Sequence, residues 1–568
     1  MKEQYLSMVQ SMDLFYETVS RRRITLESDP FSGGYSDICG LSETSTASGF
    51  MSNFLQIYAC RDSKYYRSPS VLCEINNACR YILSHTNKDC TSNLMITDFH
   101  TPATFDVISI VRGYRIFLKY CGQTEAEKET AALVLSVIER HAKGILASGF
   151  RTPNHRWVES AALFMTYNIL GWPELNEKAR KYVAEGIDID VYGEFTERSP
   201  GMYNAVNDNA LLVMAEEGNM PELYPMVAKN MELLFNYIEC DGSIFTQNSR
   251  RKDKGEGAAS GKWYPGHPYY YLYLWAGLIM KNKRFLKFAD YIYRDSVAGG
   301  RGTPGALWLF LLNPELIDFD LDAEIVDTIL PTTYAAYYPL SNIYRRRKEF
   351  FSYSIIANSP NFLFLKCGDL TVYVRACASF FMKAQFIPKK VEKTETGFRL
   401  QMHVSDDYKL PLETPPATSD FYAIDHSKRK HCQLCELDIF LDFIDTENGL
   451  KMHVYTESNA SPIPFKLEYV VLPSCRVETD NVMLDAHAGG NIVIKQGAVR
   501  LEHFESGHTI LINGLFGKHR YHTNMRGSVP PASDAFTIYS TDFCPVDAIV
   551  EFICDIRDSA SVPSNPIL

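Results

Sequence analysis

The hydrophobic pattern of this chain changes its period near residue 330, and no other feature limits the fold as strongly. Before that point, apolar residues recur at three- and four-residue spacing, which is typical of helices that bury one face. The expected helices include residues 105–120, 125–146, 158–170, 174–185, 203–217, 221–238, 269–281 and 285–293. Paired helices in long succession without a clean sequence repeat predict an (α/α) toroid, expected over residues 1–330.

After residue 330 the apolar residues alternate or form short β-branched runs with turn residues between them. The expected strands are residues 351–357, 361–367, 370–376, 398–404, 434–443, 450–455, 465–472, 491–496, 499–503 and 509–513. Many short strands at this spacing predict an antiparallel β-sandwich, expected over residues 331–568. The irregular segment 313–340, with several prolines and acids, is interpreted as the connection between the two domains.

The size and composition are those of a folded protein with more than one core. At 568 residues and 64.6 kDa, the chain exceeds what one ordinary core supports. Hydrophobic residues make up 46% and charged residues 22%, as in globular proteins. The net charge of −11 argues against a general nucleic-acid binder, although it leaves room for a local basic pocket.

The sequence is that expected of a soluble protein of the cytoplasm. Its beginning has no basic segment followed by an apolar run, so no secretory signal is expected. Since no apolar run is long enough to cross a bilayer, no membrane partner is expected either. The scattered cysteines fit buried free thiols in a reducing compartment. The sequence leaves open whether the chain assembles into a homo-oligomer.

Two polar clusters, residues 151–157 and 193–204, stand just before expected helices. Cleaving a uronic acid by elimination requires that its carboxylate be neutralised, that the C5 proton be accepted and that a proton be given to the leaving oxygen. Asn154 is suited to the first task, helped by Arg156 or Arg198. A neutral His155 and the phenol of Tyr203 are suited to the two proton transfers. These residues are the candidate catalytic groups.

Simpler interpretations stay open. Asn154 can cap the helix that starts near Arg156, with His155 bonded to the backbone. Glu197 can act in glycoside hydrolysis with a second carboxylate, the candidates being Asp190, Glu159 and Asp98. Glu194 and Glu197 are too close on one loop to form an opposed pair, so Glu197 is expected to orient His155 or an arginine.

Three further segments supply candidates for substrate binding. His100, before the expected helix 105–120, can reach the same end of the toroid or be structural. Arg250 and Arg251 begin a basic run after the Asp241-Gly242 turn, where a groove for carboxylate or sulfate groups is expected unless the run is a solvated face. Trp263 and Tyr264 can stack on sugar rings, whereas the aromatic run 269–273 is expected in the core.

Metal and cofactor sites are not expected. Cys432 and Cys435, with His426 and His431 before them, resemble half a zinc site, but no second cysteine pair has matching spacing. Several histidines crowd the C-terminal region, and the sequence does not tell which of them reaches the space between the domains: His503, His508, His519 and His522.

The chain resembles the heparinase II/III-like polysaccharide lyases in the order of its two domains. The resemblance also rests on the Asn154-His155 pair at a helix start and on the pattern Glu197-x-Ser199-x-x-x-Tyr203. It implies that Asn154 neutralises the uronate, that Tyr203 is the acid, and that His155 is the base or a second neutralising group. The stretch Gly368-Asp369-Leu370-Thr371, at the place of a histidine-bearing segment of the family, has no histidine.

The leading hypothesis is a lyase that cleaves uronic-acid-containing oligosaccharides by β-elimination. An acidic oligosaccharide is then the expected partner, and imported oligosaccharides fit a cytoplasmic enzyme better than a polymer does. A glycoside hydrolase that uses Glu197, and a carbohydrate-binding protein without turnover, are the alternatives.

Overall fold

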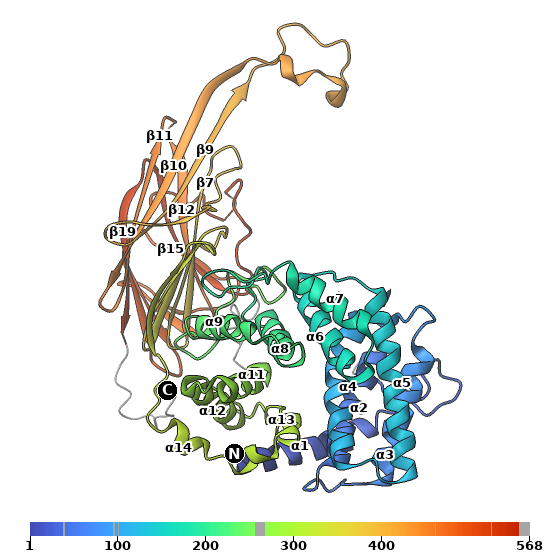
Figure 1. Ribbon diagram of the computed structural model, residues 1–568. Coiled ribbons are helices and arrows are strands. Elements are labelled where there is room, and N and C mark those ends of the chain that lie inside the picture. Colours follow the sequence, from blue (N-terminus) through green and yellow to red (C-terminus); the bar gives the residue numbers. More distant parts are fainter. Residues whose placement is uncertain are drawn as a thin grey trace.

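The computed structural model describes residues 1–37, 40–94, 97–99, 101–255, 267–460, 462–523 and 525–555 (Figure 1). Its first half is helical, with a small hairpin of β1 (Ser92–Leu94) and β2 (Thr97–Phe99). The helices are α1 (Lys2–Ser20), α2 (Thr44–Ala59), α3 (Pro69–His85), α4 (Thr101–Tyr120), α5 (Glu125–Ala147), α6 (Pro153–Leu170), α7 (Pro173–Ala184), α8 (Tyr203–Glu217), α9 (Tyr224–Phe235), α11 (His267–Met280), α12 (Lys283–Ala298), α13 (Leu307–Leu312) and α14 (Leu321–Ile325). Short 3-10 helices, η1 (Pro221–Leu223) and η2 (Pro314–Asp318), precede α9 and follow α13.

The helices form two layers of a ring. Helices α2, α4, α6, α8 and α11 pack against one another in succession, and α3, α5, α7, α9 and α12 each pack against the helix before them (Figure 1). Trp308 of α13 contacts Trp275 of α11, while α13 also packs on α2 and α4, so the inner layer closes. The predicted (α/α) toroid is therefore confirmed.

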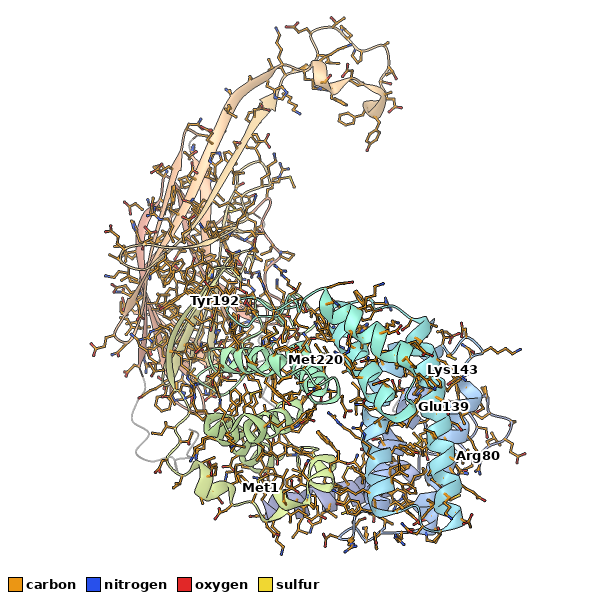
Figure 2. The ribbon with its side chains drawn as sticks, viewed as in Figure 1. Met1, Arg80, Glu139, Lys143, Tyr192 and Met220 are labelled. Carbon is orange, nitrogen blue, oxygen red and sulfur yellow. The ribbon has the colours of Figure 1, made fainter. Side chains whose placement is uncertain are left out.

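Helix α1 joins the start of the ring to its end. The amino group of Met1 donates a 2.9 Å hydrogen bond to the carbonyl of Phe319, and the Tyr270 hydroxyl donates to Gln4 at 2.7 Å. Figure 2 labels Met1 beside the last helices of the ring, with Arg80, Glu139 and Lys143 on the far side. The ring is thus tied by contacts between residues far apart in the sequence.

Local chemistry explains where individual helices begin and end. Helix α5 begins at a capping box, in which Thr124 accepts from the Glu127 amide and Glu127 accepts from the Thr124 amide. Helix α6 has proline at its first position, where a missing amide hydrogen costs little. It ends at Gly171, whose φ of 71° is a left-handed conformation that glycine adopts without strain.

The second half is a β-sandwich with two large sheets. Its strands are β3 (Thr333–Tyr338), β4 (Ile343–Lys348), β5 (Phe351–Ile356), β6 (Leu363–Cys367), β7 (Leu370–Ala378), β8 (Val391–Lys393), β9 (Phe398–Lys409), β10 (His431–Thr446), β11 (Gly449–Ser458), β12 (Ile463–Val471), β13 (Cys475–Glu478), β14 (Met483–Asp485), β15 (Asn491–Val493), β16 (Gln496–His503), β17 (Thr509–Phe516), β18 (Phe536–Cys544) and β19 (Asp547–Asp555). One sheet has the order β14-β13-β16-β17-β19-β11-β10-β9-β8 and the other β15-β18-β12-β7-β6-β5-β4-β3. Neighbouring strands are antiparallel except β15 and β18, so the predicted antiparallel sandwich is confirmed.

The interpretation of residues 313–340 as an irregular connection is wrong in its last part. Strand β3 (Thr333–Tyr338) lies within it and forms the edge of one sheet, paired with β4. Its sequence, Thr-Tyr-Ala-Ala-Tyr-Tyr, contains no strict alternation, because the toroid buries residues on the face that an isolated sandwich would expose to water.

One face of the sheet that contains β3 to β7 packs on the toroid. Arg345 of β4 and Glu239 are both buried and lie 3.1 Å apart, and Lys366 of β6 binds Asp241 at 2.5 Å. The Asp241-Gly242 turn is therefore part of the domain junction and not the wall of an open groove. Away from this junction, β9 and β10 extend as a long hairpin beyond the rest of the sandwich (Figure 1).

None of the helices in the described part of the chain has the length and apolar character needed to cross a lipid bilayer.

Candidate active site

The starts of α6 and α8 are the place where the predicted catalytic residues meet. Both helices belong to the inner layer and pack directly against each other. Asn154 is the second residue of α6, and Tyr203 is the first residue of α8. The loop before α8 brings Glu197 to Asn154, from which it is 43 residues distant in the sequence. All three predicted catalytic residues thus lie at these two helix starts, Asn154 and His155 on α6 and Tyr203 on α8.

Asn154 uses its amide to hold Glu197. Its Nδ2 atom donates to Glu197 Oε1 at 2.8 Å and to Thr152 Oγ1 at 3.1 Å. Thr152, and not Asn154, is the N-cap of α6, and it makes no side-chain capping bond. The capping interpretation of Asn154 is therefore wrong. Asn154 Oδ1 and Glu197 Oε2 are buried without a hydrogen-bond partner among the described residues.

Arg251 connects Glu197 to Tyr203. Its Nη1 atom lies 2.9 Å from Glu197 Oε1, and its guanidinium carbon lies 4.4 Å from the centre of the Tyr203 ring. Burial raises the pKa of Glu197, whereas Asn154 and Arg251 act in the opposite direction. The arginine of this cluster is thus Arg251, where the sequence had suggested Arg156 or Arg198.

Asp253 fixes the loop that carries Arg251. This carboxylate has no exposed surface, and it accepts from Ser199 Oγ at 2.8 Å and from Ser249 Oγ at 2.6 Å. It also accepts from the Gly201 amide at 3.1 Å, directly before α8. Ser199 in turn accepts from the Tyr203 amide at 3.1 Å. No role for Asp253 follows from the sequence, because the charged run around it contains no sign that one carboxylate turns inward.

His155 lies beside this cluster as a neutral side chain. Its ring meets that of Phe105 edge-on with a centroid distance of 5.6 Å. Burial, with Arg251 and Arg151 nearby, lowers the pKa of His155 to about 4. Its Nδ1 atom is buried and has no hydrogen-bond partner in the described part of the chain. The interpretation of His155 as a group bonded to the backbone through its ring is not supported.

The other predicted arginines point in different directions. Arg156 stacks on Trp157, donates to the Tyr182 carbonyl and lies 3.5 Å from Glu185, so α7 holds it. Arg198 crosses to the sandwich, where it donates to the carbonyls of Leu340 at 2.6 Å and Ser341 at 3.1 Å. Neither guanidinium has a contact with Asn154 or Tyr203 among those described, unlike Arg251.

The carboxylates considered for hydrolysis are held elsewhere. Glu159 is buried and paired with Lys178 at 2.7 Å. Asp190 accepts from the amides of Tyr192 and Glu194 in its own loop. Asp98 is exposed in the hairpin of β1 and β2. Glu197 itself is engaged by an amide and a guanidinium, so an opposed acid and base pair does not form from these residues.

Glu194 lies under the same loop, at the junction with the sandwich. It accepts from the Tyr237 hydroxyl at 2.7 Å, from Asn248 at 3.4 Å and from the Ser341 hydroxyl. Burial raises the pKa of Glu194 to about 7. Tyr192, labelled in Figure 2 where the two domains meet, lies 5.9 Å from the Tyr338 ring.

Two cavities border the cluster. One, of about 280 Å³, is lined by Phe150, Arg151, Thr152, Pro153, Arg156, Asp188 and Thr196. The other, of about 270 Å³, is lined by Asp188, Ile189, Asp190, Glu194, Phe195, Thr196, Arg198, Arg250 and Leu340. They share Asp188 and Thr196, and Glu197 directly follows Thr196 in the chain. Space for a ligand therefore exists on both sides of the shared wall.

Three predicted binding residues, His100, Trp263 and Tyr264, lie outside the described residues. In the sandwich, His508 approaches the Gly368-Asp369 turn, with its Nδ1 atom 3.8 Å from Asp369 Oδ2. A histidine thus reaches the turn in space although the turn's own sequence has none. In the described part of the chain, no three His, Cys, Asp or Glu side chains gather as a metal site would require.

No protein-family model and no curated protein matches this sequence. Solved structures do match. A xanthan lyase from Paenibacillus has a TM-score of 0.54 and 9% identity, with 98% of this chain and 58% of that chain covered. A chondroitin AC lyase from Streptomyces coelicolor A3 has a TM-score of 0.51 and 12% identity, with 98% of this chain and 80% of that chain covered.

The fold is that of polysaccharide lyases. The predicted resemblance to such lyases is confirmed at this level, and the likeness extends over nearly the whole chain. This chain spans only 58% of the length of the xanthan lyase. Since identities of 9% and 12% establish the fold alone, the chemistry has to be argued from the residues of this chain.

Proposed function

We propose that this chain is a carbohydrate lyase that cleaves uronic-acid-containing oligosaccharides by β-elimination. The observation that carries the proposal is the cluster of Asn154, Glu197, Arg251 and Tyr203. An amide and a guanidinium meet at one buried carboxylate, and the same guanidinium covers the ring of a tyrosine. With the neutral His155 beside them, these groups match the separate demands of elimination.

The first demand is to make the C5 proton acidic. While the uronate carboxylate is fully charged, removing that proton places a second negative charge next to it. The Arg251 guanidinium has donors beyond its contact with Glu197, and these can stabilise the charge that develops on the carboxylate oxygens. The Asn154 amide donates both of its N–H groups to Glu197 and Thr152 in this structure, so it contributes when it turns one of them from Thr152 to the substrate. Glu197 holds both donors by its Oε1 atom. Its role is to orient these two groups.

The second demand is to move two protons. Because burial and nearby arginines keep the pKa of His155 at about 4, its ring is neutral near pH 7 and able to accept the C5 proton. Tyr203 gives its hydroxyl proton to the oxygen that leaves C4. The C5–H and C4–O bonds break, a C4=C5 double bond forms and no water is consumed.

The position of the carboxylates favours elimination over hydrolysis. Hydrolysis needs two opposed carboxyl groups at the scissile bond, whereas Glu159 is paired with Lys178 and Asp190 is bonded within its own loop. An amide, an arginine, a histidine and a tyrosine gather at the cluster instead. These groups match the requirements of elimination and not those of hydrolysis, so we propose a lyase instead of a hydrolase.

The decisive test is ultraviolet absorbance during incubation with a panel of uronic-acid oligosaccharides. Elimination forms a conjugated double bond, so absorbance is expected to rise along with new reducing ends. New reducing ends without absorbance would show hydrolysis and refute the proposal. Binding without either product, for a panel that includes glucuronate, mannuronate and galacturonate oligomers, would show a carbohydrate-binding protein.

A further inference from the structure

Asp253 is a buried carboxylate that the chemistry above does not use. It has no exposed surface. Its hydrogen bonds in the described part of the chain come from two serine hydroxyls and one backbone amide, all of them neutral donors. Since burying a carboxylate among neutral groups is costly, its place beside the catalytic cluster points to a specific role.

The two serines connect this carboxylate to two residues of the cluster by the same route. Both hydroxyls donate to Asp253 Oδ1, that of Ser199 at 2.8 Å and that of Ser249 at 2.6 Å. The Ser199 hydroxyl accepts from the Tyr203 amide at 3.1 Å. The Ser249 hydroxyl accepts from the Arg251 amide, also at 3.1 Å. One oxygen atom thus fixes the backbone of both Tyr203 and Arg251.

A carboxylate suits this arrangement because it only accepts hydrogen bonds. It draws the protons of both hydroxyls toward itself and leaves their lone pairs to the two amides. Its second oxygen, Oδ2, accepts from the Gly201 amide at 3.1 Å, two residues before α8. An amide side chain of the same size would put a donor group in the place of one of these oxygens, so at least one of the three hydrogen bonds would be lost.

The two loops that Asp253 joins also meet at the reacting groups. The Arg250 amide donates to the Glu197 carbonyl at 3.1 Å, and Arg251 Nη1 lies 2.9 Å from Glu197 Oε1. The guanidinium carbon of Arg251 lies 4.4 Å from the centre of the Tyr203 ring. The place of this guanidinium relative to the phenol therefore depends on the backbone segments that Asp253 holds together.

We propose that Asp253 is a positioning residue that sets the place of Arg251 relative to Tyr203 during elimination. It acts through Ser199 and Ser249, and not on the substrate. The proposal rests on the proposed function, which gives Arg251 the task of stabilising charge and Tyr203 that of giving a proton. Both tasks belong to one reaction, so a shift between the two residues lowers the rate even when the fold is kept.

The kinetic test compares Asp253→Asn with Asp13→Asn in the full chain. Asp13 of α1 is a matched control, because this buried carboxylate accepts from the Ser63 hydroxyl at 2.5 Å and from the Lys64 amide at 3.2 Å. In Asp253→Asn, kcat of elimination is expected to fall about 10²-fold, the scale of a small misplacement of reacting groups, with a much smaller change in KM. Asp13→Asn is expected to leave both constants unchanged.

Combining Asp253→Asn with Arg251→Gln separates positioning from a general loss of structure. If Asp253 acts through Arg251, kcat of the double variant falls by less than the product of the two single effects. Single effects that multiply would overturn the proposal, as would an equal loss of kcat in Asp13→Asn.

Amide hydrogen exchange followed by mass spectrometry tests the positioning without substrate. Asp253→Asn is expected to speed exchange in segments 199–204 and 249–254, and Asp13→Asn in neither. Ser249→Ala, a smaller change, is expected to speed exchange in segment 249–254 alone. Unchanged exchange in both segments of Asp253→Asn would overturn the proposal. Since this measurement needs no turnover, a failure of the elimination chemistry would appear separately, in the absorbance test.

Discussion

Tyr203 illustrates how a single side chain is prepared by its neighbours. The guanidinium of Arg251 lies over its ring, and its amide is held by Ser199 at the first position of α8. These contacts fix the ring and leave the hydroxyl for a substrate. The Tyr203 hydroxyl has no hydrogen-bond partner among the contacts described. Its proposed role in proton transfer depends on this one oxygen atom.

We expect Tyr203→Phe to lower kcat of elimination by at least about 10²-fold, the scale of a lost general acid. Oligosaccharide affinity should stay unchanged, because the ring and its contact with Arg251 remain. Absorbance kinetics and calorimetry measure the two effects. Tyr422→Phe, at a residue that is 93% exposed, is the control. A rate near that of the wild type would remove Tyr203 from the mechanism.

Asn154 has both a structural contact and a proposed chemical role, and Asn154→Ala separates them. The loss of a preorganised donor should lower kcat by at least about 10²-fold. The loss of its bond to the buried Glu197 should also lower the free energy of unfolding by roughly 1–3 kcal/mol. Kinetics below the unfolding transition isolate the first effect. A variant that is less stable but turns over normally would leave Asn154 with the structural role alone.

At the scale of elements, the loop between α7 and α8 joins the site to the sandwich. Glu194 in this loop accepts hydrogen bonds from Tyr237, Asn248 and Ser341. The charged and titratable groups near it are Arg198, Asp190, Arg250 and Tyr338. Its pKa of about 7 in the folded chain lies above the ordinary value of 4.5 because the carboxyl is buried. Folding therefore favours the protonated form of this residue.

This shift makes stability depend on pH in a defined direction. The contribution of Glu194 is fully present below its unfolded pKa and is lost as pH rises through about 7. Gln does not titrate, so Glu194→Gln lacks this loss. The free energy of unfolding of the variant minus that of the wild type should therefore increase from pH 5 to pH 8, by up to about 3 kcal/mol at about 1.4 kcal/mol per pKa unit. Urea unfolding at both pH values measures the difference, with Glu505→Gln as the exposed control. An equal difference at the two values would contradict the assignment.

The elements themselves were largely predictable. Helix α5 was expected over residues 125–146 and is found at Glu125–Ala147, because its capping box and its apolar spacing are both local. Strand β7, expected over 370–376, is found at Leu370–Ala378 for the same reason. Strand β3 was missed because its pattern reflects burial against the toroid, which is a property of the assembled chain.

For the whole molecule, buried ion pairs at the domain junction link the two halves. Arg345 and Glu239 are at most 2% exposed as side chains, and Ser352 also donates to Glu239. Removing one partner leaves a charge buried without its counter-ion, which costs far more than the pair contributes. The sandwich and the toroid are thus joined by buried charges, each of which needs its counter-ion from the other domain.

Arg345→Leu is accordingly expected to lower the free energy of unfolding by about 3–5 kcal/mol. Denaturant unfolding followed by circular dichroism measures it. Lys283→Leu breaks the exposed pair with Glu324, 3.2 Å apart, and should cost at most about 1 kcal/mol. Equal effects of the two changes would show that burial does not set the strength of the junction.

The sequence by itself determined the helical half, the sandwich, and the placing of Asn154 and Tyr203 at helix starts. Those features follow from periodicity and turn chemistry within a few residues of each position. Only the tertiary structure decided that Arg251 pairs with Glu197, that Asp253 holds the loop, and that Asp241 is buried against Lys366. The physical reason is distance along the chain: Asn154 and Glu197 are 43 residues apart, and Asp241 and Lys366 are 125 apart. Such partners meet only when the ring closes and the sheet packs on it, and no local preference selects among the several arginines and lysines available.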